Sequence, residues 1–145
     1  MAQQQQPTLD PELKRIYEAV QGGLAKMREL QMQKTKGIEA LNKLMSQKNE
    51  NELVKTELTH LEPGAAVYKL IGPALVGQDV EDAKHVITRR LEHITSEVKR
   101  TEQSIKDTEK AEDAQREHII GLQKQMQARS AQLEQSQQQK SEDKQ

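Results

Sequence analysis

A heptad repeat of mainly apolar positions runs through two long stretches of this chain, in alternating steps of four and three residues. The first stretch comprises Leu13, Tyr17, Val20, Leu24, Met27, Gln31, Lys34, Ile38, Leu41, Met45 and Lys48. The second comprises Val80, Lys84, Ile87, Leu91, Ile94, Val98, Thr101, Ile105, Thr108, Glu112, Gln115, Ile119, Leu122, Met126, Arg129 and Leu133. Because this repeat makes α-helices wind around each other left-handedly, it predicts two helices that pack along these seams.

Local signals set the predicted ends of both helices. Residues 10–12, Asp-Pro-Glu, supply an N-cap, a proline at the first helical position and an acidic first turn. The first helix is therefore predicted over 11–60, where Glu-Pro-Gly at 62–64 stops it. Asp79 can cap a second helix over 80–128.

Residues 65–77, AAVYKLIGPALVG, lie between the two helices and alternate like a β-strand. Gly72-Pro73 interrupts the alternation as a turn, so the segment predicts one β-hairpin. A connector of nineteen residues, 61–79, is short enough that the helices must run antiparallel. The predicted fold class is thus mainly α: a long antiparallel coiled-coil hairpin with one small β-hairpin between its helices. Its register places Leu24 near Ile119 and Ile38 near Ile105.

The two ends of the chain are predicted to lie outside this fold. Residues 1–10 form a polar lead-in without periodicity, which we expect to be flexible. Residues 130–145 are rich in glutamine and charge and carry a single leucine, which favours a disordered tail.

Composition narrows the class of protein. Only 33% of the residues are hydrophobic and Tyr17 and Tyr68 are the only aromatics, which argues against a thick globular core. The 22 basic and 23 acidic residues nearly balance, so no nucleic-acid partner is expected. The absence of cysteine suits a reducing compartment. Without a secretory pattern near residue 1 or an apolar span, a cytoplasmic protein with no membrane contact is expected.

Catalytic and metal-binding motifs are missing from the sequence. No two of the four histidines are spaced by three or four residues, and no HExxH or phosphate-binding glycine loop is present. We therefore expect no enzyme activity, no catalytic residues, no cofactor and no metal.

The predicted β-hairpin is a candidate interaction surface. Val67 and Ile71 lie on one face, whereas Tyr68 and Leu70 lie on the other, so both faces are apolar. The hairpin either folds down onto its own helices or pairs with strands of other subunits, and the second interpretation is favoured because a lone hairpin is marginally stable.

A second candidate surface lies where the two helices end away from the hairpin. Its apolar positions exceed the two of a simple seam, and Gly22-Gly23 and Gly121 nearby permit local unwinding. We interpret it as a tip that repacks against varied partners, with an ordinary frayed coiled-coil end as the alternative. The candidate tip residues are Leu9, Leu13, Ile16, Tyr17, Val20, Ile119, Leu122 and Met126.

Residues 67–76, VYKLIGPALV, and 89–100, RRLEHITSEVKR, resemble the beta-class subunits of prefoldin. The resemblance extends over 51–126 and implies a prefoldin-like domain at 11–129. It also implies a heterohexamer of two alpha-class and four beta-class subunits, so that this chain would join three further beta-class partners. The hairpins of such a complex build a β-barrel body, which here would use Val67, Tyr68, Leu70, Ile71, Leu75 and Val76.

The family captures unfolded actin and tubulin and passes them to the cytosolic chaperonin without nucleotide. The resemblance therefore implies an ATP-independent holdase, with client binding assigned to the tips by position. A coiled-coil scaffold or tether with no chaperone role is the alternative.

Overall fold

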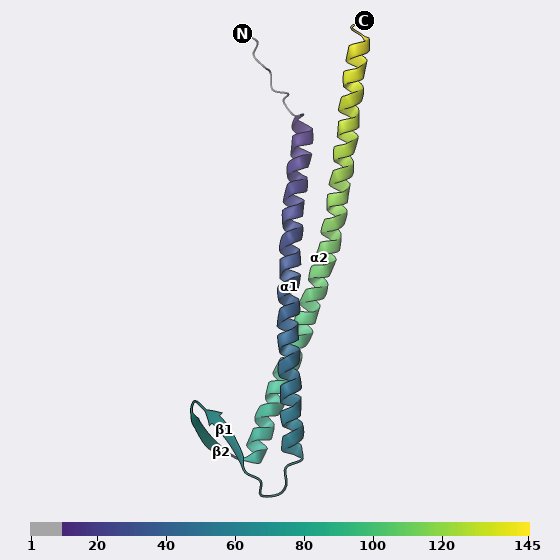
Figure 1. The fold of residues 1–145 in the computed structure, drawn as a ribbon. Helices are drawn as coiled ribbons and strands as arrows, with labels where there is room; N and C mark the ends of the chain where they lie inside the picture. The colour runs from purple at the N-terminus through teal and green to yellow at the C-terminus, as the bar shows by residue number, and fades with distance from the viewer. Residues whose placement is uncertain (1–9) are drawn as a thin grey trace. The chain divides into compact units, whose positions relative to one another are not determined.

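The computed structural model describes residues 10–145 and contains two long helices separated by a β-hairpin (Figure 1). Helix α1 spans Pro11–Thr59, strand β1 spans Val67–Ile71, strand β2 spans Ala74–Gln78 and helix α2 spans Val80–Glu142. The described residues form two compact units. Unit 1 comprises residues 10–33 with 108–145, and unit 2 comprises residues 34–107, including the hairpin.

Both helices begin at the predicted aspartate caps. The backbone N–H of Leu13 donates to Oδ2 of Asp10 at 3.1 Å, and that of Asp82 donates to Oδ2 of Asp79 at 3.3 Å. Each bond satisfies a backbone donor that the first turn of a helix leaves without an intrahelical partner. Helix α1 ends at Thr59, and a turn follows in which Gly64 has a φ of +88°. Such a positive φ favours glycine, as the sequence signal at 62–64 indicated.

Helix α2 is longer than predicted, because it continues through Glu142 where the sequence favoured an end at Ala128 and a disordered tail. Gln, Glu, Lys, Arg and Ala are good helix formers, and neither glycine nor proline occurs after Gly121. The side chains of 134–142 are exposed, so local helix propensity rather than packing accounts for this last part of α2.

Strands β1 and β2 pair antiparallel, with Val67 opposite Gln78 and Ile71 opposite Ala74. The connecting residues are Gly72, which has a φ of +57°, and Pro73. Glycine at positive φ followed by proline, whose ring fixes a negative φ, is the pattern of a two-residue type II′ turn. The ladder places Val67 and Ile71 on one face and Tyr68 and Leu70 on the other, as the alternation predicted.

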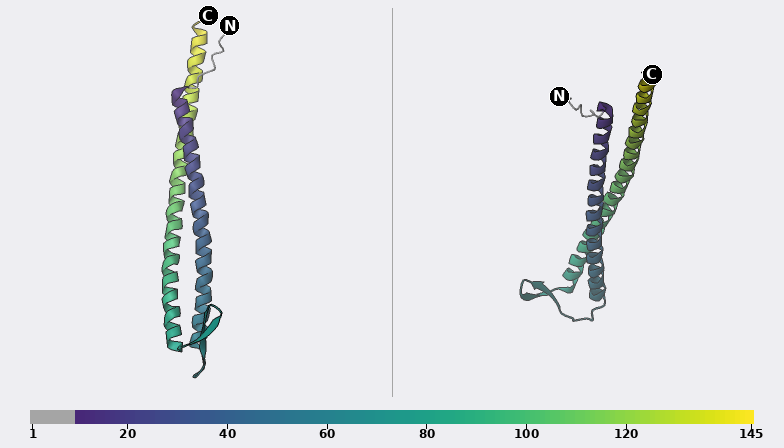
Figure 2. Two further views of the ribbon diagram at one scale, coloured as in Figure 1. Left: turned by 90° about the vertical axis from the view of Figure 1, so that its left-hand side faces the viewer. Right: turned by 45° about the horizontal axis from the view of Figure 1, so that its top comes forward.

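The hairpin of unit 2 is attached at its base to a small core. Leu58 of α1 and Ala83, Ile87 and Leu91 of α2 form a buried cluster against which Val67 packs. Figures 1 and 2 show the rest of the hairpin beside the first turns of α2 and outside the pair of helices. Only one side chain of the hairpin therefore belongs to the core of this unit.

The predicted seam of α2 is confirmed, because its positions are buried or half-buried from Val80 to Leu133. The seam of α1 is displaced at alternate positions: Tyr17, Gln31, Ile38 and Met45 are exposed, whereas the predicted Leu24 is half-buried. The α1 positions turned inward are instead Leu13, Ile16, Val20, Gly23, Met27, Leu30, Lys34, Gly37, Leu41, Leu44 and Lys48. The steps thus alternate three and four from Leu13, and residues such as Tyr17 flank the seam.

Two of the five displaced seam positions in α1 are glycines. A β-carbon at Gly23 in unit 1 would lie 3.0 Å from Cγ1 of Ile119, and one at Gly37 in unit 2 would lie 3.0 Å from Cγ1 of Ile105. Each isoleucine fills the space that a missing side chain leaves. The predicted register is therefore correct to within one residue in both units, with Gly23 and Gly37 standing where Leu24 and Ile38 were expected.

Candidate functional surfaces

The β-hairpin exposes most of its apolar side chains. Leu70 and Leu75, which are opposite each other in the ladder, retain 68% and 69% of their accessible surface. Of the six predicted interface residues Val67 is half-buried, and the exposed ones are Tyr68, Leu70, Ile71, Leu75 and Val76. The sheet has two strands, so each strand has an outer edge without a backbone partner among the described residues. Exposed apolar faces and free strand edges together favour association.

A small cavity of about 180 Å³ lies at the base of the hairpin. Leu58, Ala83 and Ile87 belong to the core beneath it, and Val54 and Val86 on the two helices are exposed beside it. Val67 packs against the helices of unit 2, and Tyr68, Lys69 and Gln78 of the hairpin also line this cavity. The upper part of the hairpin stays uncovered in unit 2.

The predicted tip residues have unequal surroundings in unit 1. Ile16, Val20 and Ile119 are buried, and Leu13, Leu122 and Met126 are half-buried. Tyr17 is 52% exposed, and Leu9 lies outside the described residues. In this conformation, therefore, most of the proposed tip surface faces the interior of the coiled coil.

An ion pair that the sequence analysis missed joins the start of α1 to α2 in unit 1. Nε and Nη2 of Arg129 donate to Oδ2 and Oδ1 of Asp10, each at 2.9 Å. The Arg129 and Asp10 side chains are only 29% and 17% exposed, and Oε2 of Glu12 lies 3.5 Å from Nε of Arg129. The hydrogen bond from Arg129, followed by that from the Leu13 amide, lowers the pKa of Asp10. The same hydrogen bond raises the pKa of Arg129.

A second contact between distant residues lies at Gly23. Nε2 of Gln115 donates to the backbone carbonyl of Gly23 at 3.1 Å, beside the Ile119 side chain that fills the glycine notch. A β-carbon at position 23 would lie 3.2 Å from that same amide nitrogen. Glycine thus permits both the isoleucine and the glutamine to approach the α1 backbone.

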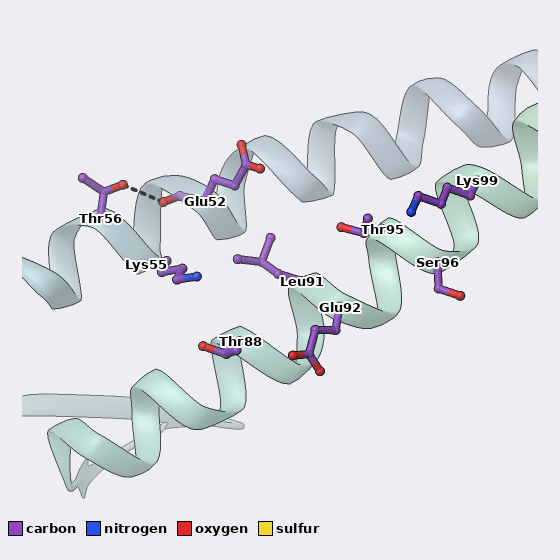
Figure 3. Close-up of a pocket in the computed structure, with 9 residues that line it drawn as sticks. All are labelled: Glu52, Lys55, Thr56, Thr88, Leu91, Glu92, Thr95, Ser96 and Lys99. Atoms are coloured by element: carbon purple, nitrogen blue, oxygen red, sulfur yellow. Dashed lines mark hydrogen bonds between the residues drawn. The ribbon is translucent and has the colours of Figure 1, made fainter.

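An open groove of about 760 Å³ lies between α1 and α2 in unit 2 (Figure 3). Leu91 of α2 and Lys55 of α1 point into it, and Oγ1 of Thr56 donates to the carbonyl of Glu52 at 2.9 Å. Its remaining side chains are hydroxyls and charges of both signs. Across residues 10–145 no three His, Asp or Glu side chains gather closely enough to hold a metal ion.

The two helices are too polar to cross a bilayer: within the part of the chain that the structure describes, neither has a sufficiently apolar span.

Comparison with known proteins gives one consistent result. Residues 21–126 match a family described as "Prefoldin subunit". Prefoldin subunit 6 of Mus musculus and of Homo sapiens are each 37% identical over 116 residues, which is 80% of this chain and 91% and 90% of theirs. Probable prefoldin subunit 6 of Caenorhabditis elegans is 40% identical over 108 residues, 73% of this chain and 86% of its own.

A solved structure shares the fold. The prefoldin beta subunit from Thermococcus strain KS-1 superposes with a TM-score of 0.51, over 85% of this chain and 96% of the other. The sequence identity is 20%, so this likeness bears on the fold alone. The matched part of the chain contains the hairpin and the glycine notches, and the Asp10–Arg129 pair lies just outside the family match.

Proposed function

This chain belongs to the prefoldin subunit family, and we propose that it serves in a heterohexameric, ATP-independent holdase for unfolded polypeptides. Membership makes it a prefoldin chaperone subunit, which assembles with other prefoldin subunits and has a helical coiled-coil fold. The proposal concerns the surfaces that this chain uses, the proteins that it holds and their destination. In this proposal the chain acts in the cytoplasm by binding other proteins and catalyses no reaction.

The β-hairpin is the proposed assembly surface, and its exposure is the observation that carries the proposal. The chain would assemble with two alpha-class and three further beta-class subunits, and strands of neighbouring subunits would pair with the free edges of its hairpin. The proposed interface residues are Val67, Tyr68, Leu70, Ile71, Leu75 and Val76. Burying a large apolar side chain contributes about 1.5–3 kcal/mol, so covering this surface supplies stability that an isolated two-stranded hairpin lacks.

The tip residues in unit 1 are the proposed client surface. Leu9, Leu13, Ile16, Tyr17, Val20, Ile119, Leu122 and Met126 would cover apolar segments of unfolded chains such as actin and tubulin. The complex would then pass these clients to the cytosolic chaperonin. Several weak contacts from different subunits act together, because joining them in one complex raises their effective concentration.

Assembly is tested by placing a charge on the hairpin. Leu70→Lys with Leu75→Lys should prevent incorporation into the complex, because the lysines cannot be buried between subunits without a large desolvation cost. The control is Leu53→Lys in α1, since Leu53 is 66% exposed and so nearly matches Leu70. Native mass spectrometry with the partner subunits reports incorporation. Normal assembly of the doubly substituted hairpin would contradict the proposal.

Holding of clients is tested with the assembled complex and chemically denatured actin. The complex should suppress light scattering from aggregating actin without added nucleotide and should leave folded actin unbound. A scaffold or tether, the alternative function, would instead bind a folded partner and show no preference for denatured protein. Equal scattering with and without the complex would contradict the holdase proposal.

A further inference from the structure

Asp10 in unit 1 has two roles at once. Its Oδ2 accepts the Leu13 amide that begins α1 and also accepts Nε of Arg129, while Oδ1 accepts Nη2. A guanidinium that meets a carboxylate at two points is held in a defined orientation. The first turn of α1 is therefore fixed to α2 through a single carboxylate.

An apolar seam lies directly below this ion pair. Ile16 and Val20 are on the same face of α1 as Gly23, two turns and one turn before it respectively, and both are buried. Ile119 of α2 is buried against the Gly23 notch, where Gln115 donates to the Gly23 carbonyl. The seam is thus bounded by an ion pair at the start of α1 and by a hydrogen bond at the notch.

We propose that the Asp10–Arg129 pair is a latch over a concealed binding site, whose floor is Ile16, Val20 and Ile119. When the latch opens, residues 11–22 move away from α2 and the apolar seam accepts an apolar segment of an unfolded chain. This inference rests on the proposed holdase function, and it explains why three tip residues are buried in the closed conformation.

The closed state has a modest energetic advantage. Gly22-Gly23 weakens α1 at the point where opening would begin, because glycine is a poor helix former. A β-carbon at Gly22 would have no atom within 4 Å, so that face of the helix carries no packing against α2. The ion pair remains in contact with water, and salt weakens such a pair. A ligand that binds the open state alone can then shift the population toward it.

Two substitutions separate the latch from the helix cap. Arg129→Gln removes the guanidinium from α2 and leaves the cap of α1 unchanged. Asp10→Asn removes the charge while keeping a residue that caps helices well. The control is Arg116→Gln, because Arg116 forms a more exposed ion pair with Asp113 at 3.0 Å, and both residues of that pair belong to α2.

The experiment uses the full chain assembled with its partner subunits and chemically denatured actin as the probe. Arg129→Gln and Asp10→Asn should speed amide hydrogen exchange over residues 11–20 by about threefold to tenfold, as loss of a modest ion pair predicts. Both variants should capture actin at lower complex concentration and lose the salt dependence of the wild type. Arg116→Gln should match the wild type in exchange and capture.

The outcomes distinguish the latch from the holdase function. A wild-type complex that holds no denatured actin would contradict the proposed function and, with it, the site. An active wild type whose exchange and capture are unchanged by Arg129→Gln would overturn the latch alone. Faster exchange with weaker capture would also overturn it, because an open seam would then not be the binding surface.

Discussion

Gly23 of α1 makes room for Ile119 of α2, whose Cγ1 would lie 3.0 Å from a β-carbon at position 23. The neighbouring Gly22 has open space at the same place. Two adjacent glycines in one helix therefore differ in whether an opposing side chain occupies the volume that a β-carbon would need.

This difference predicts opposite effects of alanine. Gly22→Ala should stabilise the helix by about 1 kcal/mol, because alanine is the better helix former and meets no neighbour. Gly23→Ala should destabilise unit 1 by about 1–3 kcal/mol, since the added methyl group overpacks against Ile119. Thermal unfolding of the full chain followed by circular dichroism measures both. Two equal shifts of the same sign would contradict the notch.

The helix register can be tested by cross-linking, because the chain has no cysteine of its own. Cys at 23 and 119 in unit 1, or at 37 and 105 in unit 2, should form disulfides on oxidation, because each isoleucine Cγ1 is 3.0 Å from the glycine β-carbon position. Disulfides need β-carbons about 3.5–4.5 Å apart. Cys at 22 with Cys at 119 is the control, and it should cross-link far more slowly. Equal rates would refute this register.

Acid should loosen the start of α1. The hydrogen bonds from Arg129 and the Leu13 amide lower the pKa of Asp10 from its ordinary 3.8. A carboxyl whose pKa is lower in the folded state than in the unfolded state stabilises the fold. This contribution is complete above the ordinary pKa and disappears as the pH falls through the lowered value. Hydrogen exchange over 11–20 should therefore become less protected below about pH 4. Asp10→Asn should remove this dependence, and an unchanged pH profile in that variant would contradict the assignment to Asp10.

The core at the base of the hairpin should be sensitive to loss of volume. Ile87 is buried in the cluster that holds Val67, whereas its neighbour Val86 is exposed. Ile87→Ala should destabilise unit 2 by about 2–5 kcal/mol, because it removes transfer free energy and leaves a cavity. Val86→Ala is the control and should change stability by about 0.5 kcal/mol or less. Thermal unfolding of the full chain measures the stability of both variants. If both lost similar stability, Ile87 would not belong to the core of unit 2.

Sequence periodicity predicted α2 better than α1 for a physical reason. The α2 seam consists largely of aliphatic residues such as Ile87, Leu91 and Ile94, which a hydrophobic pattern detects directly. In α1 the alternate seam positions include Gly23 and Gly37, whose role is to be small, so a hydrophobic pattern passes them over. A heptad that keeps Leu24 and Ile38 in place of these glycines also places the exposed Tyr17 in the seam instead of the buried Ile16.

The candidate surfaces were predicted to different extents. The hairpin followed from Gly72-Pro73 and from residue alternation, both of which are local signals. The Asp10–Arg129 pair joins residues 119 positions apart, and no pattern along either helix indicates it. The sequence showed Asp10 only as a helix cap and Arg129 only as a heptad position. The two side chains meet only because of the register between the two helices, and a shift of one residue would abolish their ion pair.

The exposed hairpin also has a consequence for the amount of this protein that a cell makes relative to its partner subunits. In a copy made in excess of its partners, Leu70 and Leu75 remain exposed. Strands with exposed apolar side chains and unpaired edges tend to aggregate and are recognised by quality-control proteases. Synthesis of the subunits must therefore be matched in amount, and surplus copies are expected to be short-lived.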